Sequence, residues 1–173
     1  MRVTNVQIAN IIRLRIMGAA MDELDSAIVA ALQSDGRRSN RDLAQMLGVA
    51  PSTTLERVRA LRARGVITGI HASTDTAKMG RPVRGMITVR LRPQSREIVQ
   101  GFRDFVIGLP ETLQVFVTTG AEDLLVLVAV ESTEALRDFV LDSLTKRREV
   151  AGVRTEVVFD HLQNHVVAPG RRR

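Results

Sequence analysis

Residues 39–67 read SNRDLAQMLGVAPSTTLERVRALRARGVI, and this stretch decides the fold of the N-terminal half of the chain. Its apolar positions recur at helical spacing in two runs, which predicts two short amphipathic helices. The runs are Leu43, Ala44 and Leu47, then Thr54, Val58 and Leu61. Between them, Gly48 can adopt the left-handed conformation that ends a helix, and Pro51 suits the first turn of the next. This order predicts a helix-turn-helix, whose second helix lies in the DNA major groove.

Arginine dominates the charge of this stretch. Between residues 36 and 65, seven basic residues oppose only Asp42 and Glu56. The seven are Arg37, Arg38, Arg41, Arg57, Arg59, Arg62 and Arg64. A surface of this sign suits phosphate neutralisation and counterion release on DNA. The alternative is a pair of helices with a solvated basic face. Small hydroxyl side chains at the start of the second helix favour DNA, because they can approach base edges and phosphates closely.

The net charge of +6 is unevenly distributed along the 173 residues. Residues 1–92 hold 15 Lys and Arg against 7 Asp and Glu, whereas residues 93–173 hold 10 against 12, so the halves carry +8 and −2. A basic partner surface therefore belongs to the N-terminal half. The chain has no cysteine, which excludes disulfides and thiolate chemistry and fits a reducing cytoplasm. It also lacks Trp and Tyr, which argues against stacking on single-stranded nucleic acid.

Two segments precede the helix pair. Residues 21–35 carry apolar residues at helical spacing after the capping residue Asp22, which predicts a first helix and completes a three-helix unit. Residues 1–20 are apolar but interrupted by Arg13 and Arg15, which disfavours a signal peptide, and they are too short and charged to span a bilayer. We expect them to form an extra helix or a flexible extension, unless Met21 is the true initiator.

From residue 83 the helical spacing gives way to alternation. Apolar residues alternate with Arg84, Thr88 and Arg90 across residues 83–92, which predicts a half-buried strand. The later elements are expected at 98–109 (helix), 113–119 and 124–130 (strands), 136–144 (helix) and 153–159 (strand). The order β-α-β-β-α-β predicts an α+β chain, with a ferredoxin-like αβ-sandwich after the helix-turn-helix domain. Helices would cover one face of the sheet, and a second copy of the chain would cover the other.

Two long runs of the chain resemble a known family. Residues 24–70, with the segments Asp35-Gly36-Arg37 and Gly65-Val66-Ile67, resemble the N-terminal domain of the Lrp/AsnC bacterial transcription regulators, the leucine-responsive, asparagine-operon or feast/famine family. The βαββαβ half, with TTGAEDLLVLV at residues 118–128, resembles that family's amino-acid-sensing domain. The resemblance covers about residues 21–160, nearly everything except the two ends.

The resemblance implies a sequence-specific DNA-binding transcription regulator that is not an enzyme and needs no cofactor. Its implied partners are double-stranded DNA, a small effector that is usually an amino acid, and further copies of itself, as dimers that assemble into larger oligomers. No membrane association is expected. The chain then divides into an N-terminal extension (1–20), a helix-turn-helix DNA-binding domain (21–68), a linker strand (69–82), a βαββαβ effector-binding and oligomerisation domain (83–160) and a basic tail (161–173).

Carried onto this chain, the resemblance places DNA contacts in the helix-turn-helix and effector contacts in the turn between the second and third strands. The DNA-binding residues implied are Arg37, Arg41, Ser52, Thr53, Thr54, Glu56, Arg57 and Arg59. The effector-binding residues implied are Thr119, Gly120, Ala121, Glu122 and Asp123, whose backbone N–H groups and carboxylate could hold an amino acid's two charged ends. Two alternatives stay open. Arg57 could be a structural ion-pair partner, and the turn could be a tight β-turn in which Asp123 bonds its own backbone.

Three departures from the family pattern carry expectations of their own. Ala50 stands where the family commonly has a serine that caps the recognition helix, so Ser52 is expected to take over and shift the start of that helix. Thr54 replaces a usual aliphatic residue, which should soften the core slightly. The effector turn carries Glu122 and no aromatic residue, which leaves the class of ligand open.

Other functions are less well supported by the residues. His161 and His165 have a spacing that could bind metal on a helix, but they lie where the last strand gives way to a polar tail, so no metal site is expected. The arginines at 171–173 are expected to form a disordered tail. An enzyme is disfavoured because the predicted domain core offers no cysteine, no histidine and no paired carboxylates with a base. The alternative function is a nucleoid-type architectural DNA-binding protein without a ligand.

Overall fold

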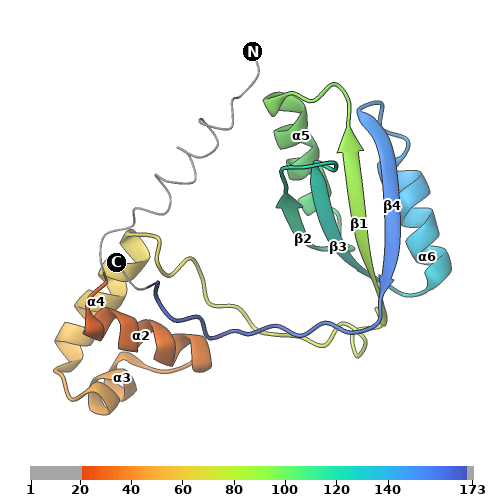
Figure 1. Cartoon of the computed structure of the whole chain (residues 1–173). Coiled ribbons are helices and arrows are strands. Elements are labelled where there is room, and N and C mark those ends of the chain that lie inside the picture. Colours follow the sequence, from red (N-terminus) through yellow and green to blue (C-terminus); the bar gives the residue numbers. More distant parts are fainter. Residues whose placement is uncertain (1–20, 171–173) are drawn as a thin grey trace. The chain divides into compact units, whose positions relative to one another are not determined.

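The computed structural model describes residues 21–170, which form two compact units (Figure 1). Among the described residues, one unit is helical and comprises residues 21–73 together with the segment 162–170; the other is Thr74–His161. The predicted N-terminal extension lies outside the described residues. Across residues 21–170, no helix is long and apolar enough to cross a membrane.

The helical unit contains the three predicted helices, α2 (Glu23–Ser34), α3 (Asn40–Leu47) and α4 (Pro51–Ala63). Each of the first two begins at a side-chain cap, since Asp22 accepts the N–H of Asp25 and Ser39 forms a reciprocal capping box with Asp42. Gly48 ends α3 with a φ of 68°, in the left-handed region that suits glycine. The local signals in the sequence therefore place the helix boundaries.

The start of α4 differs from the expectation. Ala50 occupies the N-cap without any side-chain hydrogen bond, and Pro51 is the first helical residue. Ser52 therefore does not take over the capping role. Proline supplies a preset φ and lacks the N–H that a cap would have to satisfy, so the helix can begin here without a polar cap.

The core of the helical unit lies between the inner faces of the three helices. Ile28, Leu43 and Leu61 are fully buried there, and Val58 packs beside them. Val66 and Ile67 follow the last helix and pack against the same cluster, so the first residues after α4 still belong to the core of the helical unit. The predicted three-helix arrangement is confirmed.

The second unit has the predicted βαββαβ order. Its elements are β1 (Val83–Leu91), α5 (Arg96–Ile107), β2 (Thr112–Val117), β3 (Leu124–Val130), α6 (Thr133–Asp138) continued by the π-helical segment η1 (Phe139–Leu144), and β4 (Val150–Val158). The strands are antiparallel neighbours in the order β2-β3-β1-β4 (Figure 1). The predicted α+β class and ferredoxin-like order are confirmed, and only the π-helical end of the second helix was not anticipated.

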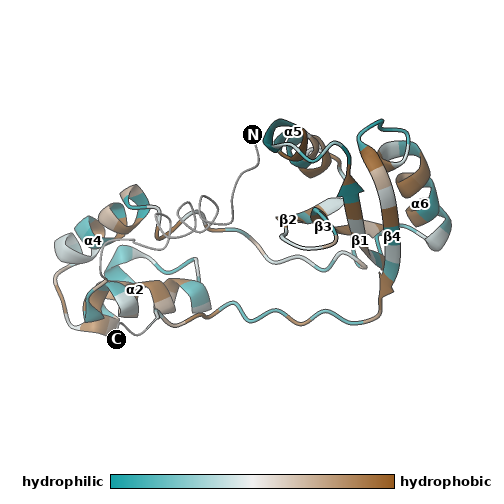
Figure 2. Ribbon diagram, turned by 45° about the horizontal axis from the view of Figure 1, so that its top comes forward, coloured by the Kyte–Doolittle hydropathy of each residue, from teal (hydrophilic) through white to brown (hydrophobic). Residues whose placement is uncertain are grey.

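One face of the sheet is covered by the two helices, as the hydrophobic inner surfaces of α5 and α6 indicate (Figure 2). Phe102 of α5 and Leu136 of α6 pack with Ile87 of β1 in the main core. Gly85 leaves room for this packing, because a Cβ there would lie 2.7 Å from a methyl carbon of Leu136. Helix α6 therefore sits close on β1.

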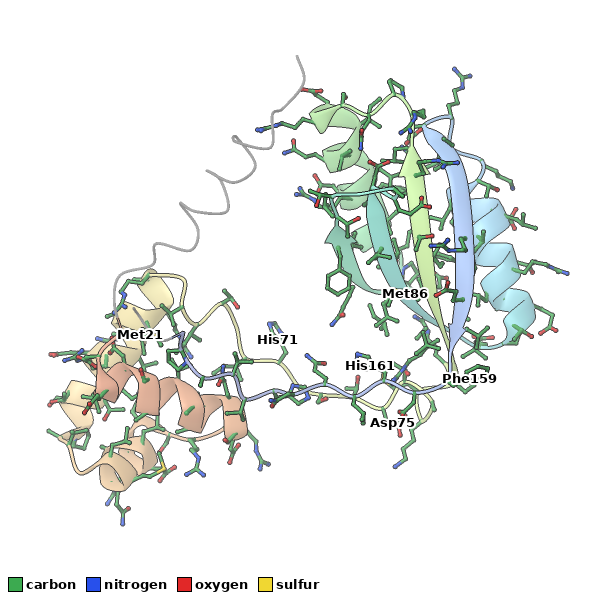
Figure 3. The ribbon with its side chains drawn as sticks, in the orientation of Figure 1. Met21, His71, Asp75, Met86, Phe159 and His161 are labelled. Carbon is green, nitrogen blue, oxygen red and sulfur yellow. The ribbon has the colours of Figure 1, made fainter. Side chains whose placement is uncertain are left out.

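The opposite face of the sheet, which we call the open face, carries the residues that alternate with this core. Met86 of β1, which is labelled in Figure 3, is paired in register with Leu127 of β3 and Glu156 of β4. Phe116 of β2, opposite Leu125, is 46% exposed. The open face thus has an apolar part over β2 and β3 and a charged part toward β4.

The predicted linker strand at residues 69–82 is wrong. All of these residues are described, and none of them pairs into a sheet. Residues 68–75 are extended without strand pairing, and Asp75 then begins a series of turns that ends at Gly80, with a φ of 83°. Arg81 donates to the carbonyl of Pro110 and Arg84 to the hydroxyl of Thr76, so side chains rather than a strand hold the end of the linker on the sheet unit.

Candidate DNA-binding surface and effector turn

Helix α4 divides its residues between a core face and an outward stripe. Thr54, Val58 and Leu61 are buried. Successive residues of a helix are about 100° apart around its axis. The side opposite the buried residues therefore carries Ser52 and the positions four, seven and eleven residues after it. These positions are Ser52, Glu56, Arg59 and Ala63, all of which are exposed. We call them the α4 stripe.

Arg57 lies on a flank of α4 rather than on the stripe, and it is bound to α2. Its Nη1 is 2.5 Å from the carboxylate of Asp22 and 3.2 Å from that of Asp25. Arg64, the C-cap residue of α4, lies on the same flank as Arg57, and its Nη1 is 3.0 Å from the other carboxylate oxygen of Asp25. The hydrogen bond to Asp22 raises the pKa of Arg57 above its ordinary value. This is the structural ion pair that the sequence left open, and it fixes the recognition helix against α2.

Thr54 does not belong to a DNA-binding surface. Its side chain is fully buried in the helical core, and its hydroxyl has no hydrogen-bond partner there. The prediction that it contacts DNA is wrong, because position 54 points inward on the same face as Val58. Its replacement of an aliphatic residue therefore leaves a polar atom unsatisfied in the core. By contrast, Thr53 is half-buried and Ser52 exposed.

The predicted basic residues before α4 lie at the surface. Arg37 is 93% exposed and pairs with Asp35 at 3.3 Å, and Arg41 is exposed in the first turn of α3. Two further arginines, Arg38 and Arg62, line a groove beside α4 together with Arg59. Both contribute to the positive charge of residues 36–65, but neither the helical spacing nor the family resemblance implies that they contact DNA. Only the packing of the turn before α3 against α4 brings them together.

The predicted effector turn, residues 118–123, connects β2 to β3 and closes on itself. Thr118 donates its N–H to the carbonyl of Asp123 and its hydroxyl to the carbonyl of Glu122. Thr119, Gly120 and Ala121 are exposed, and Gly120 has a φ of 146°. The N–H groups of these three residues have no acceptor among residues 21–170. The turn therefore presents free backbone donors at its tip.

The Asp123 side chain was predicted either to bind an effector or to bond its own backbone, and its contacts in the structure match neither role. It is 4% exposed, and its carboxylate accepts the N–H of Leu91 at 2.7 Å and a hydrogen bond from the side chain of Gln94. The carboxylate of Asp123 therefore bonds outside its own turn, and each of its two oxygens accepts a hydrogen bond. The predicted direct contact with an effector is corrected to a positioning role, because the carboxylate ties the turn to the loop between β1 and α5.

The histidine pair is not arranged for a metal. His161 follows β4 in an extended segment, and His165 lies further along that segment, so the helical spacing on which metal binding would depend is missing (Figure 3). Within the described part of the chain, no group of three His, Cys, Asp or Glu side chains could hold a metal ion.

Comparison with known proteins agrees with the division of the chain into a helix-turn-helix unit and a sheet unit. The family profile described as the AsnC-type helix-turn-helix domain matches residues 21–62, and that of the Lrp/AsnC ligand binding domain matches residues 84–167. The chain belongs to the Lrp/AsnC family. These two Lrp/AsnC profiles fall on the helical unit and on the sheet unit with the segment that follows it.

Relatives of the chain are Lrp/AsnC-type transcription regulators rather than enzymes. The HTH-type transcriptional regulator AldR of Mycolicibacterium smegmatis is 37% identical over 83% of this chain and 84% of its own length. The leucine-responsive regulatory protein of Rhizobium meliloti is 30% identical over 86% and 96%. Among solved structures, a transcriptional regulator in complex with L-Met from Neisseria meningitidis has a TM-score of 0.77, 25% identity and coverage of 87% and 97%. AsnC of E. coli has a TM-score of 0.75, with 25% identity and coverage of 87% and 99%.

Proposed function

We propose that this Lrp/AsnC protein is a sequence-specific transcription regulator, acting in the cytoplasm, whose α4 stripe reads double-stranded DNA. The observation that carries the proposal is that Ser52, Glu56 and Arg59 form one exposed line on a helix whose other two sides are buried or ion-paired. These side chains can respectively approach a base edge, accept from a cytosine amino group and donate to guanine or phosphate. Arg37 and Arg41 would contact flanking phosphates.

Selection of duplexes from random DNA tests this reading against an architectural, nucleoid-type role. A regulator should enrich one motif and protect it in footprinting, whereas an architectural binder would show little preference. Arg59→Ala should weaken binding to the enriched duplex and leave the helical content of the protein unchanged. Arg103→Ala, which removes one exposed charge from the sheet unit, is the matched control and should bind like the parent. Enrichment of no motif would refute sequence-specific recognition.

The proposed regulator is a dimer that buries the open face, and dimers assemble further. Support comes from Met86, half-buried, and Phe116, 46% exposed, on a face that no helix of the described chain covers. Two sheets packed face to face are a common way to bury such surfaces. Phe116→Asp should therefore shift the protein toward monomer in sedimentation velocity, with Leu141→Asp, an exposed apolar position on η1, as the control.

The effector of the proposed regulator is an amino acid bound at the turn between β2 and β3. The free N–H groups of Thr119, Gly120 and Ala121 suit a carboxylate, and Glu122, half-buried beside them, could meet an ammonium group. A thermal-shift screen against the amino acids tests this, because a ligand of the folded state raises its melting temperature. Failure of every amino acid to raise it would remove the amino-acid effector from the proposal.

In this proposal the effector acts through assembly rather than by touching DNA. An effector that does not touch DNA shifts the DNA-bound population only by binding one state of the protein more tightly than another, and here we propose that these states differ in association. A ligand at the turn would change how dimers pack and so the spacing of their recognition helices, which must match whole helical turns of DNA. Asp123→Ala should leave DNA binding intact and abolish the change in oligomer size that the effector causes. Glu131→Ala, exposed beyond the other end of β3, should respond like the parent.

A further inference from the structure

A groove of about 510 Å³ lies beside the α4 stripe. Of the predicted DNA contacts, only Arg59 lines it. Three guanidinium-bearing residues line it, Arg38 from the turn before α3, and Arg59 and Arg62 from α4. Its floor is formed by the apolar residues Leu32, Leu55, Val58 and Ile70. Three like charges that line one groove repel one another and favour the binding of an anion there.

The acidic residues near the groove are already engaged elsewhere. No Asp or Glu of the described chain contributes to the groove lining. Asp35 accepts from Arg37, and Asp42 accepts from the backbone and hydroxyl of Ser39. Across residues 21–170, neither Arg59 nor Arg62 forms an ion pair, and Arg38 donates only to the sulfur of Met46, at 3.7 Å. Arg59 and Arg62 are thus available to an external anion. Arg38 attracts Asp35 and Asp42 but forms no ion pair with either of them, so its guanidinium can also meet an anion in the groove.

The position of the groove identifies the anion. Arg59 belongs both to the α4 stripe and to the arginine-lined groove of the protein. This protein groove therefore adjoins the surface that would enter the major groove of DNA. Asn40, whose side chain makes no hydrogen bond within residues 21–170, adds a neutral donor to the same wall. When a recognition helix lies in the major groove, the phosphates that border that groove run alongside it. Donors beside the helix therefore meet phosphodiester oxygens rather than base edges.

We propose that the groove lined by Arg38, Arg59 and Arg62 binds a backbone phosphate of the DNA strand that borders the recognition helix. Arg38 and Arg62 are the new contacts, and they fix the position of the protein on the duplex without reading bases. This proposal rests on the proposed function, because it requires the protein to bind DNA. It adds a site whose ligand is a phosphodiester and whose contribution is independent of sequence.

The test is the salt dependence of binding to the enriched duplex and to a random one, measured by fluorescence anisotropy for the intact protein. Arg38→Ala and Arg62→Ala should each make log K against log[salt] shallower by about one unit, with equal loss on both duplexes. Arg62→Lys, which keeps the charge, should keep most of the slope. Arg137→Ala, which removes a 67% exposed charge from α6, should change nothing.

A duplex with single methylphosphonate substitutions locates the contact. One neutral linkage beside the motif should weaken binding of the parent more than binding of the Arg38→Ala, Arg62→Ala double variant, which keeps only Arg59 at the groove. Unchanged salt slopes in the variants, or a loss confined to the enriched duplex, would overturn the groove assignment while the parent still binds DNA. A parent that binds neither duplex would instead refute the proposed function, and the groove assignment with it.

Discussion

Asp25 is the residue through which α2 holds the recognition helix. Its side chain is 3% exposed, and each of its oxygens meets a different arginine of α4, at 3.2 Å to Arg57 and 3.0 Å to Arg64. A buried carboxylate is stable only when it is paired in this way. Because the two arginines lie on one flank of α4, the pair of contacts sets the rotation of the helix and hence the direction of its exposed stripe.

Asp25→Asn should destabilise the helical unit by about 2–3 kcal/mol, since hydrogen bonds to charged groups are worth that much and two are weakened. The measurement is a urea titration followed by far-UV circular dichroism. Arg59→Ala, on the stripe, is the control and should unfold with the parent. Equal stability of Asp25→Asn and the parent would mean that the ion pairs do not hold the helix.

Thr54→Val should stabilise the protein by about 1 kcal/mol, because it replaces an unsatisfied buried hydroxyl with a methyl group of similar size. Affinity for DNA should stay at the parent's level, since position 54 is 0% exposed. A melting curve and an anisotropy titration on the same preparation check both points. Loss of DNA affinity in a folded variant would restore Thr54 to the DNA-binding surface.

At the scale of single residues, the sequence predicts which interactions a side chain can make but not which partners it meets in the fold. Helical spacing places Thr54 on the apolar face with Val58 and Leu61, whereas the resemblance implies that it contacts DNA. Only its burial in the structure decides between the two. Asp123 looked like a ligand or a local turn residue, and its partners lie 32 and 29 positions away at Leu91 and Gln94. Arg57 was left with two roles, because the position of α2 against α4 depends on tertiary packing.

Individual elements were predicted where their signals are local. Caps, proline and left-handed glycine positions act within one turn, so the boundaries of α2 and α3 and the glycine after α4 could be placed from neighbouring residues. The strands followed from alternation because one face of the sheet is packed by helices. The linker at 69–82 failed because an extended segment becomes a strand only if another strand offers it hydrogen bonds.

The capping box of α3 gives a prediction that depends on pH. Hydrogen bonds from Ser39 hold the pKa of Asp42 below its ordinary value, so the charged carboxylate stabilises the folded unit. This stabilisation is complete above the unfolded pKa, about 4, and is lost as pH falls toward the lower folded pKa. Asp42→Ala should therefore melt earlier than the parent at neutral pH, and the difference should shrink in acid. A difference that is independent of pH would assign the effect to something other than the carboxylate.

At the scale of the whole molecule, the two units carry different candidate sites. The helical unit carries the candidate DNA surface with the seven arginines between residues 36 and 65, and the sheet unit carries the turn with the predicted effector residues and the open face. Membership of the Lrp/AsnC family could be inferred from sequence because its motifs are local and specific. The face that we propose a second copy covers could not be composed from the sequence, because it depends on strand register, which brings Met86, Leu127 and Phe116 onto the side away from the helices.

Residues 83–160 alone should be at least dimeric and should not bind DNA. The fragment contains the open face and excludes all seven arginines of the stretch between residues 36 and 65. Multi-angle light scattering gives its mass, and anisotropy against the enriched duplex gives its affinity. A well-folded monomer would remove the open face as the dimer interface.

The most direct test of the central claim is the affinity of the intact protein for its enriched duplex, measured by anisotropy with each amino acid in turn. A regulator that senses an amino acid through the turn at residues 118–123 should show a changed dissociation constant with at least one of them. The same amino acid should leave the affinity of Asp123→Ala unchanged. An affinity that no amino acid alters, in a protein that binds the enriched and random duplexes equally, would contradict both specific recognition and effector control.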